Sequence, residues 1–368
     1  MTLKNVKLGT VLEYEQPTKY IVESEDYSEE FRIPVLTAGK SFILGYTNES
    51  DGIFTDFPVI IFDDFTTAIK YVDFPFKVKS SAMKILKANK ELADIRYLYY
   101  KMLTISILCN EHKRYWISKF SQIEIPLPSI TTQKKIAAIL DAADVYRQKT
   151  KTLIEKYDQL AQSLFLEMFG DPVTNEKGWE KTATINYCSC IVPGRDKPKS
   201  FTGDIPWVTT CDLNHLGFTE KSNSNIALSK SEIAVVKAKI IPKGSVIMTC
   251  VGDLGIISIN SNPIVINQQL HAFQCSERIN NLFLMYNLSH QTSYMHKMAS
   301  STTVPYMNKT IANNTPTIVP PIALQNQFAE RIQLIDQQKQ QAQASLQKAE
   351  DLFNSLLQRA FKGELVKE

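Results

Sequence analysis

Hydrophobic positions recur with heptad spacing in two long stretches of this chain, at about residues 132–169 and 324–361. Within each stretch, apolar or small side chains alternate at intervals of four and three residues, the pattern that packs one helix against another in a coiled coil. A proline precedes each stretch, and Gly170 or Gly363 follows it, as is usual where helices begin and end. The sequence therefore predicts two helices of roughly 38 residues, each about 55 Å long.

The predicted seam of these helices is defined by its 4-3-4-3-4 spacing. It comprises Tyr146, Thr150, Leu153, Tyr157, Leu160 and Leu164 in the first helix, and Ala342, Leu346, Ala349, Phe353, Leu356 and Ala360 in the second. Two such seams in one chain pack most simply against each other, so we expect an antiparallel coiled-coil spacer. The alternative, that each helix packs only on its own globular region, fits less well because so long a helix outruns the face of an ordinary domain.

The two helical stretches also match residue by residue at one fixed offset of 192 positions, without a gap. The matching pairs include Pro128 and Pro320, Ile130 and Ile322, Gln133 and Gln325, Ala137 and Ala329, Asp144 and Asp336, Lys156 and Lys348, and Phe169 and Phe361. An ungapped match of this length indicates a duplicated module, in which a globular region followed by a helix occurs twice.

Both globular regions combine strands and helices rather than repeating a βαβ pattern. Branched and aromatic side chains predict strands at residues 31–37, 59–62, 204–210, 246–249 and 255–259, and helices are predicted at residues 95–103 and 282–288. We therefore expect an α+β fold: two mixed α/β domains separated by two long antiparallel helices, with a pseudo-twofold internal repeat. The expected division of the chain is 1–130, 131–171, 172–322 and 323–368.

Outside the shared elements, the loops of the two globular regions differ almost completely. One scaffold would thus carry two different surfaces. A symmetric dimer reads a palindromic DNA site, whereas a pseudo-dimer with two unlike faces would read two unlike half-sites.

The net charge of +3 at pH 7 is too small to indicate a nucleic-acid partner by itself, but the charge is unevenly distributed. Residues 13–30 are acidic, whereas residues 66–119 hold eleven Lys and Arg against four Asp and Glu. A local basic surface is what phosphate binding needs, because local cations displace counterions from DNA. A solvated surface of mixed charge explains the same pattern equally well.

The composition is that of a globular protein, with 44% hydrophobic and 21% charged residues. No run of about 18 apolar residues occurs and the start lacks the apolar stretch of a signal peptide, so we expect a cytoplasmic protein with no membrane partner. The six cysteines include no C-x-x-C pair, so we expect free thiols and no metal or redox site.

Motifs that would indicate catalysis are incomplete. The Thr37–Ser41 stretch resembles the end of a phosphate-binding loop, but Pro34 stands where that motif requires glycine. Asp63 and Asp64 are adjacent on a predicted strand, so their side chains would point to opposite faces. The five histidines lack the H-E-x-x-H spacing, and no Asn-Pro-Pro-Tyr-like methyltransferase motif occurs. We therefore predict no catalytic residue.

Several motifs, in this order, resemble those of type I restriction–modification specificity subunits. They are Glu167–Pro172 with Asn175–Trp179, Gly203–Val208 followed by Ile266–His271, Ser300–Lys309, and the Pro-Pro-x-x-x-Gln entry to a helix at Pro320–Gln325. The first copy of that helix entry departs from the pattern, with Ser129 in place of the second proline. The resemblance covers essentially the whole chain, and the order of the motifs is more specific than any one of them.

The resemblance implies a non-catalytic, sequence-specific DNA-binding subunit. Two target recognition domains would each read one half of an asymmetric bipartite site in double-stranded DNA, and the helices would set the spacing between the halves. The helices would also dock two adenine methyltransferase subunits, and restriction/translocase subunits would join the assembly. The chain itself would need no cofactor, because its partners would carry S-adenosylmethionine and ATP.

Polar or basic side chains in loops are the candidate DNA-binding residues, since phosphates are contacted by Lys, Arg, Ser and Thr, and bases by Arg, Lys, Asn and Gln. In the first domain they are Lys40, Ser41, Thr66, Thr67, Lys70, Lys77, Lys79, Lys113 and Arg114. In the second they are Arg195, Lys197, Lys199, Thr209, Thr210, Asn214, Gln268, Gln269, Thr303 and Lys309. Each also has a structural interpretation as an exposed residue or a strand-end hydrogen bond, and Gln268 and Gln269 could hold a buried turn together.

Two other classes of function remain open from the sequence. One is a fused restriction–modification enzyme, against which the chain length and the missing motifs argue. The other is a coiled-coil adaptor that binds only proteins, which leaves the divergent basic loops unexplained.

Overall fold

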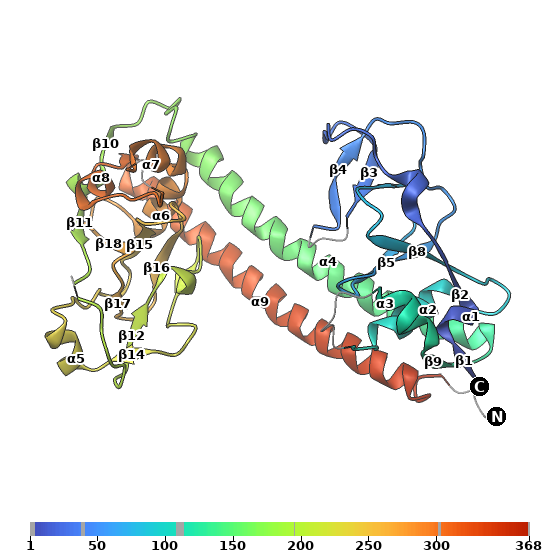
Figure 1. The fold of residues 1–368 in the computed structure, drawn as a ribbon. Coiled ribbons are helices and arrows are strands. Elements are labelled where there is room, and N and C mark those ends of the chain that lie inside the picture. The colour runs from blue at the N-terminus through green and yellow to red at the C-terminus, as the bar shows by residue number, and fades with distance from the viewer. Residues whose placement is uncertain (1–3, 38–40, 108–113, 195, 301–302, 367–368) are drawn as a thin grey trace. The chain divides into compact units, whose positions relative to one another are not determined.

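The computed structural model describes residues 4–37, 41–107, 114–194, 196–300 and 303–366, and its chain divides into two compact units (Figure 1). Unit 1 consists of Met1–Lys151 and Ala344–Glu368, and unit 2 of Thr152–Gln343. The boundary falls inside the two long helices, because the ends of each helix pack on different globular regions.

Unit 1 contains three small sheets. Its elements are β1 (Lys4–Lys7), α1 (Leu8–Val11), β2 (Leu12–Glu15), β3 (Ile33–Leu36), β4 (Ile43–Thr47), β5 (Val59–Asp63), β6 (Ile69–Val72), β7 (Lys77–Val78), β8 (Met83–Ala88), α2 (Ile95–Leu103), α3 (Tyr115–Ser118) and β9 (Glu124–Leu127). The strand orders are β2-β8-β5-β6, β4-β3-β7 and β1-β9.

Unit 2 has the same plan with a few additions. Its elements are β10 (Lys181–Ala183), β11 (Cys188–Ile191), β12 (Ile205–Val208), β13 (Phe218–Thr219), β14 (Ala227–Leu228), α5 (Lys230–Val235), β15 (Val246–Thr249), β16 (Ile257–Asn260), β17 (Val265–Ile266), β18 (Leu270–Cys275), α6 (Asn281–Ser289), α7 (Thr292–Met298), α8 (Lys309–Asn313) and β19 (Pro316–Ile318). The strand orders are β11-β18-β15-β16-β13, β14-β12-β17 and β10-β19.

The pairing of the strands confirms the internal repeat. In unit 1 the parallel pair β3–β7 aligns Leu36 with Val78, and in unit 2 the parallel pair β12–β17 aligns Val208 with Ile266. Strands β2, β8, β5 and β6 correspond to β11, β18, β15 and β16 in the same order. The expected α+β fold with two mixed domains is therefore correct.

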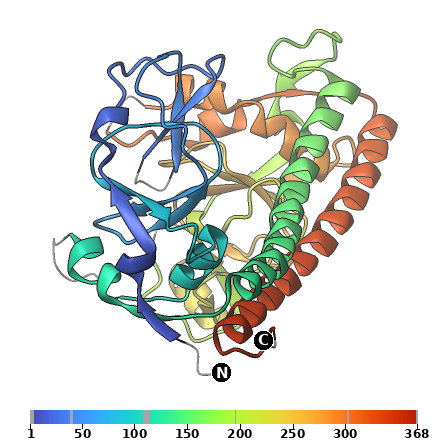
Figure 2. The same ribbon diagram turned by 90° about the vertical axis from the view of Figure 1, so that its right-hand side faces the viewer.

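The long helices are α4 (Ile130–Phe169) and α9 (Ile322–Phe361), which lie side by side and antiparallel within each unit (Figures 1 and 2). In unit 1, Lys151 of α4 pairs with Glu350 of α9 at 3.3 Å. In unit 2, Lys339 of α9 pairs with Asp158 of α4 at 2.5 Å. Both ion pairs are partly exposed and each contributes at most about 1 kcal/mol, so the apolar seam dominates the pairing.

The predicted seam is right for α9 and half wrong for α4. All six predicted α9 positions are buried or half-buried, from Ala342 to Ala360. On α4, Thr150 is buried and Tyr157 and Leu164 are half-buried, but Tyr146, Leu153 and Leu160 are 54%, 43% and 50% exposed. The seam instead uses the next residue in each case, namely Arg147, Ile154 and Ala161. Two heptad registers share Thr150, Tyr157 and Leu164, and the larger leucines favoured the wrong one.

A buried glutamine near the start of each long helix ties it to its domain. Oε1 of Gln133 accepts from the backbone N–H of Asp94 at 2.8 Å, and its Nε2 donates to the carbonyls of Pro128 and Leu92 at 2.8 and 3.2 Å. Gln325 makes the matching three bonds, with the N–H of Asn280 at 2.9 Å and the carbonyls of Pro320 and Arg278 at 2.7 and 3.4 Å. Both glutamines are fully buried.

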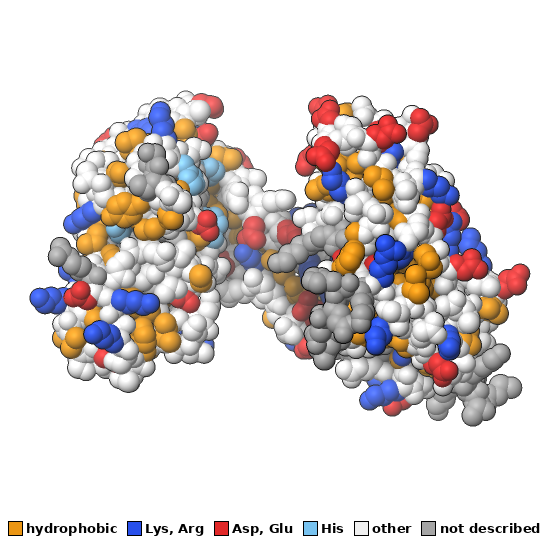
Figure 3. Space-filling model, in the orientation of Figure 1, with side chains coloured by type: hydrophobic (Ala, Val, Ile, Leu, Met, Phe, Trp, Pro, Cys, Tyr) orange, Lys and Arg blue, Asp and Glu red, His pale blue; other side chains and the backbone are white. Residues whose placement is uncertain are grey.

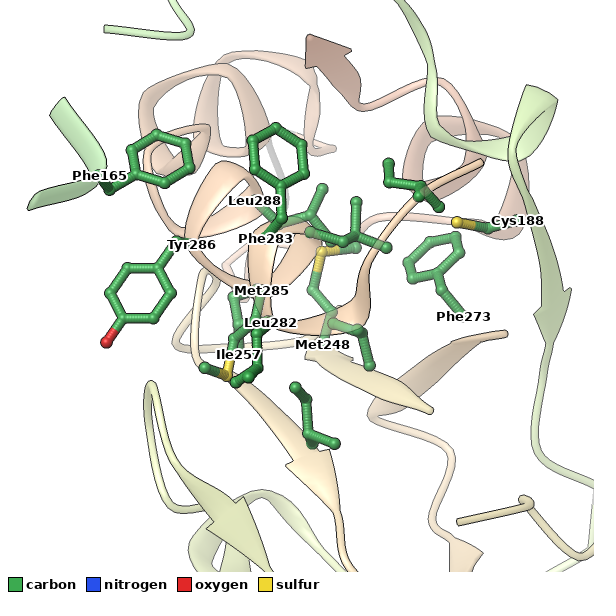
Figure 4. Packing of buried hydrophobic residues seen from close by; sticks show 14 of the residues in the cluster. Phe165, Cys188, Met248, Ile257, Phe273, Leu282, Phe283, Met285, Tyr286 and Leu288 are labelled. Carbon is green, nitrogen blue, oxygen red and sulfur yellow. The ribbon is translucent and has the colours of Figure 1, made fainter. Parts of the chain in front are cut away.

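Asp94 and Asn280 are in turn the N-caps of α2 and α6, so the domain helix and the long helix are oriented together. The core of unit 2 lies beside this junction (Figure 4). Phe165 of α4 packs against Phe283 of α6 at 5.7 Å and against Phe328 of α9 at 5.6 Å between ring centroids. Met248, Ile257 and Phe273 extend the same cluster across the sheet. The corresponding core of unit 1 includes Phe353 and Ala360 of α9.

Candidate nucleic-acid interface

In unit 2, loops that the sequence singled out converge at the carboxyl ends of the parallel strands β12 and β17. The backbone N–H of Asn267 donates to the carbonyl of Val208 at 3.0 Å, which brings the two strand ends together. Oε1 of Gln269 accepts from the Asn267 amide at 3.0 Å and faces the Thr210 hydroxyl at 3.4 Å. The exposed Gln268 donates to the carbonyls of Gly194 and Asp196 at 3.1 and 3.2 Å. The edge therefore presents exposed amide and hydroxyl groups held in place by their neighbours.

The same edge exists in unit 1 with different side chains. The N–H of Lys79 donates to the carbonyl of Leu36 at 2.8 Å, in the place of the Asn267–Val208 bond. Lys79, Ser80 and Ser81 therefore follow β7 where Asn267, Gln268 and Gln269 follow β17. The connection to the next strand thus carries a cation and two hydroxyls in unit 1, where Ala82 is one residue more, and three amides in unit 2.

Beside this edge, unit 1 has a polar hollow of about 490 Å³. Its lining includes Gln16, Thr18, Ser80, Ser81, Lys84 and Arg114. Lys84 is buried, and its ammonium lies 3.6 Å from the Asp64 carboxylate, whose other oxygen accepts from the N–H of Trp116 at 2.8 Å. Burial lowers the pKa of Lys84, and Asp64 opposes that shift. The exposed Arg114 adds a second positive charge to the hollow.

In unit 2 the neighbouring polar residues include His271 and Lys309. Burial and, to a smaller extent, the charge of Lys309 lower the pKa of His271 to about 4, so the imidazole is neutral near pH 7. The segment 303–309 reaches this region because the N–H of Met307 donates to the carbonyl of Cys250 at 2.8 Å. The adjoining turn between β15 and β16 contains Gly252 and Gly255 at φ 80° and 90°, a backbone conformation that favours glycine.

One predicted candidate is corrected. Lys77 is 3% exposed, pairs with Glu49 at 2.5 Å and donates to the Asp51 carbonyl at 2.7 Å. Its charge is neutralised inside the domain, so it is a structural residue and not a phosphate contact. Its position in the sequence of β7 gave no sign of this, because the acidic partner lies in a distant loop.

Three other candidates are engaged in local contacts but keep some exposure. Lys79 pairs with Glu25, and the Thr66 hydroxyl donates to Asp63. The N–H and hydroxyl of Thr209 both bond to Asp212, in a capping box that shapes the loop after β12.

Most of the remaining candidates are half-buried or exposed, and three lie outside the described residues. Half-buried or exposed are Ser41, Thr67, Lys70, Arg114, Lys197, Lys199, Thr210, Asn214, Gln268, Gln269, Thr303 and Lys309. Lys40, Lys113 and Arg195 lie outside the described residues. The loop clusters described above bring together Thr210, Gln268 and Gln269 in unit 2, whereas in unit 1 only Arg114 among the candidates lines the hollow. None of these placements tests a contact with DNA.

The same regions contain polar residues that were not among the sequence candidates, namely Ser80, Ser81 and Lys84 in unit 1 and His271 in unit 2. The sequence feature that indicates burial of Lys84 is its position between the apolar residues Met83, Ile85 and Leu86. A lysine at such a position is buried and needs a partner or a function.

The surface charge of unit 1 is polarised, as the sequence predicted. Acidic side chains gather over the region of β3 and β4, and Lys and Arg side chains lie on other parts of the same face (Figure 3). The acidic segment packs there because the N–H of Ser28 donates to the carbonyl of Tyr46 in β4 at 3.1 Å.

Other chemistry is not indicated within the described part of the chain. No group of three or more His, Cys, Asp or Glu is arranged to hold a metal there, and the five described cysteines are free. Asp63 and Asp64 face different partners, as expected for adjacent strand residues. Among the described helices, none combines the length and apolar character needed to cross a membrane.

Comparison with known families gives one match. The profile of the type I restriction modification DNA specificity domain matches residues 2–157 and 192–350, once for each half of the chain.

Two similar proteins are named as type I restriction enzyme specificity subunits. The EcoR124I/EcoR124II specificity subunit of Escherichia coli is 37% identical over 261 residues, which cover 65% of this chain and 62% of that protein. The HindI specificity subunit of Haemophilus influenzae is 24% identical over 132 residues, covering 34% of this chain and 28% of that protein. This chain therefore matches less than two thirds of the length of either relative.

Solved structures share the fold at low sequence identity. The S subunit of a type I restriction–modification system from M. genitalium superposes with a TM-score of 0.61 at 15% identity, covering 98% of this chain and 96% of that one. A chain from a structural study of assembly and conformational transition in a type I restriction–modification system has a TM-score of 0.55 at 18% identity, covering 99% and 100%. Both comparisons bear on the fold alone.

Proposed function

This chain belongs to the type I restriction–modification DNA specificity family, and from that premise we propose that it reads an asymmetric, two-part DNA sequence without catalysing a reaction itself. The observation that carries the proposal is the matched strand edge of the two units. Lys79, Ser80 and Ser81 occupy it in unit 1, and Asn267, Gln268 and Gln269 in unit 2. Asn and Gln suit adenine, Lys suits guanine and Ser suits several bases, so the two edges would favour different sequences.

Affinity would come from exposed cations around each edge. Lys70 in unit 1, and Lys197, Lys199 and Lys309 in unit 2, are placed on the surface of their own unit. Contacts between such side chains and phosphates are independent of sequence and weaken as salt rises. We expect these residues to position the DNA, while the strand edges select it.

Catalysis would belong to partner subunits. Two adenine methyltransferase subunits carrying S-adenosylmethionine would dock on the paired helices, and restriction/translocase subunits using ATP would complete a cytoplasmic assembly. The solved structure named for complex assembly of a type I system supports an assembled state for a chain of this fold. In this arrangement α4 and α9 set the spacing between the two half-sites.

The test is modification-sensitive sequencing of DNA from cells that express the partner methyltransferase with and without this chain. We expect an asymmetric two-part adenine-methylation motif that appears only when the chain is present. A variant with Gln268→Ala and Gln269→Ala should alter one half of that motif and leave the other unchanged.

Two outcomes would contradict the proposal. If the purified complex assembles but no new motif appears, the chain is an adaptor rather than a DNA reader. If the purified chain methylates or cuts DNA without partners, it is an enzyme.

A further inference from the structure

At the floor of the hollow in unit 1, Lys84 is buried with unused hydrogen-bonding capacity. Its side chain is 3% exposed, and the 3.6 Å separation from Asp64 is too long for a hydrogen bond. An ammonium has three N–H donors, and buried donors in proteins are almost always paired. An incompletely satisfied cation that lines a polar hollow is therefore suited to a ligand that accepts hydrogen bonds.

His271 occupies the matching position of unit 2. In unit 1, Met83 of β8 pairs with Asp63, the last residue of β5; in unit 2, Leu270 of β18 pairs with Thr249, the last residue of β15. Met83 and Leu270 are therefore equivalent, and so are the residues that follow them, Lys84 and His271. His271 is 6% exposed, and its Nδ1 is buried without a hydrogen-bond partner among the described residues. Both units therefore place a buried nitrogen with unfilled hydrogen-bonding capacity at one and the same strand position.

Two neighbours of this position also correspond. The N–H of Asp64 donates to the carbonyl of Ala82, and the N–H of Cys250 donates to that of Gln269, at 3.4 and 2.7 Å. The carbonyl of Asp64 accepts from the N–H of Tyr115 at 3.2 Å, and the carbonyl of Cys250 accepts from the N–H of Met307 at 2.8 Å. Cys250 therefore occupies in unit 2 the position that Asp64 occupies in unit 1.

Tyr115 and Met307 are thus equivalent, and the residues that precede them, Arg114 in unit 1 and Tyr306 in unit 2, are equivalent as well. A fourth position follows from the outer strands. Glu15 pairs with Ile85 across β2–β8, and Ile191 pairs with Ala272 across β11–β18. The preceding residues, Tyr14 and Cys190, are therefore equivalent. The Lys84 ammonium lies 5.1 Å from the centroid of the Tyr14 ring.

We propose that these four matched positions form the specificity-determining pocket of each recognition unit, with Lys84 and His271 reading a base edge at its centre. In unit 1, Asp64, Lys84 and Arg114 line the hollow and Tyr14 lies beside Lys84. The matched positions of unit 2 are Cys190, Cys250, His271 and Tyr306. The proposal rests on the DNA-reading function proposed above. In unit 1 the two cations suit the paired acceptors of guanine, N7 and O6, so the half-site read by this unit contains a G at that position.

A base edge fits this pocket better than a phosphate. Phosphate is the same in every DNA sequence, so a phosphate site duplicated with the fold would keep a cation at its centre in both units. The matched position of unit 2 instead holds an imidazole that is neutral near pH 7. All four positions differ in chemistry between the units, as expected where each unit selects a different base.

The test uses the full chain co-expressed with its methyltransferase partner and read by modification-sensitive sequencing. Lys84→Met keeps the volume of the side chain and removes the donors. We expect about a tenfold or greater loss of preference at one base pair in one half of the motif, with the other half unchanged. His271→Gln should change only the other half.

A matched control is Lys77→Met. Lys77 is a second buried lysine of unit 1, but its partners are Glu49 and the Asp51 carbonyl. The strand register places Val265 at its position in unit 2, so the fold accepts an apolar side chain there. This variant should leave the motif unchanged. Arg114→Ala provides a second test variant at an exposed position, should Lys84→Met prevent assembly of the complex.

Three results would overturn the proposal. An unchanged motif in both Lys84→Met and Arg114→Ala removes these residues from recognition. Methylation that falls equally at all sites, with a weaker dependence on salt, identifies a phosphate contact instead. A change in both halves of the motif contradicts a pocket confined to one unit. The underlying function fails in a different way, because the unmodified chain would then produce no two-part motif at all.

Discussion

At the scale of single residues, the paired glutamines Gln133 and Gln325 are buried polar side chains with a full set of partners. Each is fully buried and makes three hydrogen bonds to backbone groups of its own unit. They connect the first turn of a long helix to the N-cap of a domain helix, and so fix the angle at which the helix leaves the domain. The sequence match between them therefore reflects a matched set of bonds.

Gln325→Leu should lower the free energy of unfolding by about 2 kcal/mol or more. The substitution leaves the Asn280 N–H and two carbonyls without their partner, and an unsatisfied buried group costs roughly 1–3 kcal/mol. Urea denaturation followed by circular dichroism measures the change. Gln338→Leu, at an exposed position of the same helix, should change it by less than about 0.5 kcal/mol. Equal effects of the two variants would show that the buried bonds contribute little.

Individual site residues were only partly predictable from the sequence. Exposed loop residues such as Gln268 and Gln269 were predicted because polar side chains in loops are the usual readers of DNA, and their contact with DNA stays a prediction. Lys77 was predicted to contact DNA but is buried against Glu49, and Lys84 was not among the candidates, although both are lysines of unit 1 strands. What distinguishes them is the distance to Glu49 or Asp64, which depends on how separate strands pack and has no local sequence signal.

At the scale of elements, the internal repeat identifies the correct heptad register of α4, which the spacing of hydrophobic residues alone left ambiguous. Subtracting 192 from the α9 seam positions Leu346 and Phe353 gives Ile154 and Ala161, which are the observed α4 positions. The heptad spacing alone could not decide between this register and the one through Leu153 and Leu160. The information was present in the sequence, but it lay in the comparison of the two helices rather than in the hydrophobicity of one.

The corrected register predicts a small loss of stability at one residue and a larger loss at its neighbour. Leu160 is 50% exposed, so Leu160→Ala should lower the free energy of unfolding by less than about 1 kcal/mol. Ala161 is 5% exposed beside Phe165, so Ala161→Leu should overpack the seam and cost about 1–3 kcal/mol. Paired urea titrations check both. If Leu160→Ala costs about 2–5 kcal/mol, as for a buried leucine, the register through Leu160 is correct instead.

At the scale of the whole molecule, the duplication was the feature that the sequence predicted best. The order of globular region, helix, globular region and helix follows from the ungapped offset, and the antiparallel pairing follows from two seams in one chain. The three sheets of each unit did not follow, because parallel pairs such as β3–β7 join strands separated by some forty residues of loops and other strands. Such non-local pairings carry little local sequence signal.

If the helices set the spacing of the two half-sites, lengthening both should lengthen the gap. A duplication of Arg147–Leu153 together with Lys339–Ser345 adds one heptad to each helix at equivalent positions and preserves the seam. Seven residues add about 10 Å, close to three base pairs of DNA at 3.4 Å each. Modification-sensitive sequencing should therefore report the same two half-motifs separated by about three more base pairs. An unchanged distance between the half-motifs would show that the helices do not set the spacing. Duplication in one helix alone should abolish methylation.

The division of the chain between the two units has a consequence for how the protein is made. Unit 2 is one continuous stretch, whereas unit 1 combines residues from both ends of the chain. The core of unit 1 needs Phe353 and Ala360, which leave the ribosome after every residue of unit 2. Because domains tend to fold as units during synthesis, the half of the protein that is translated first is the half that is completed last.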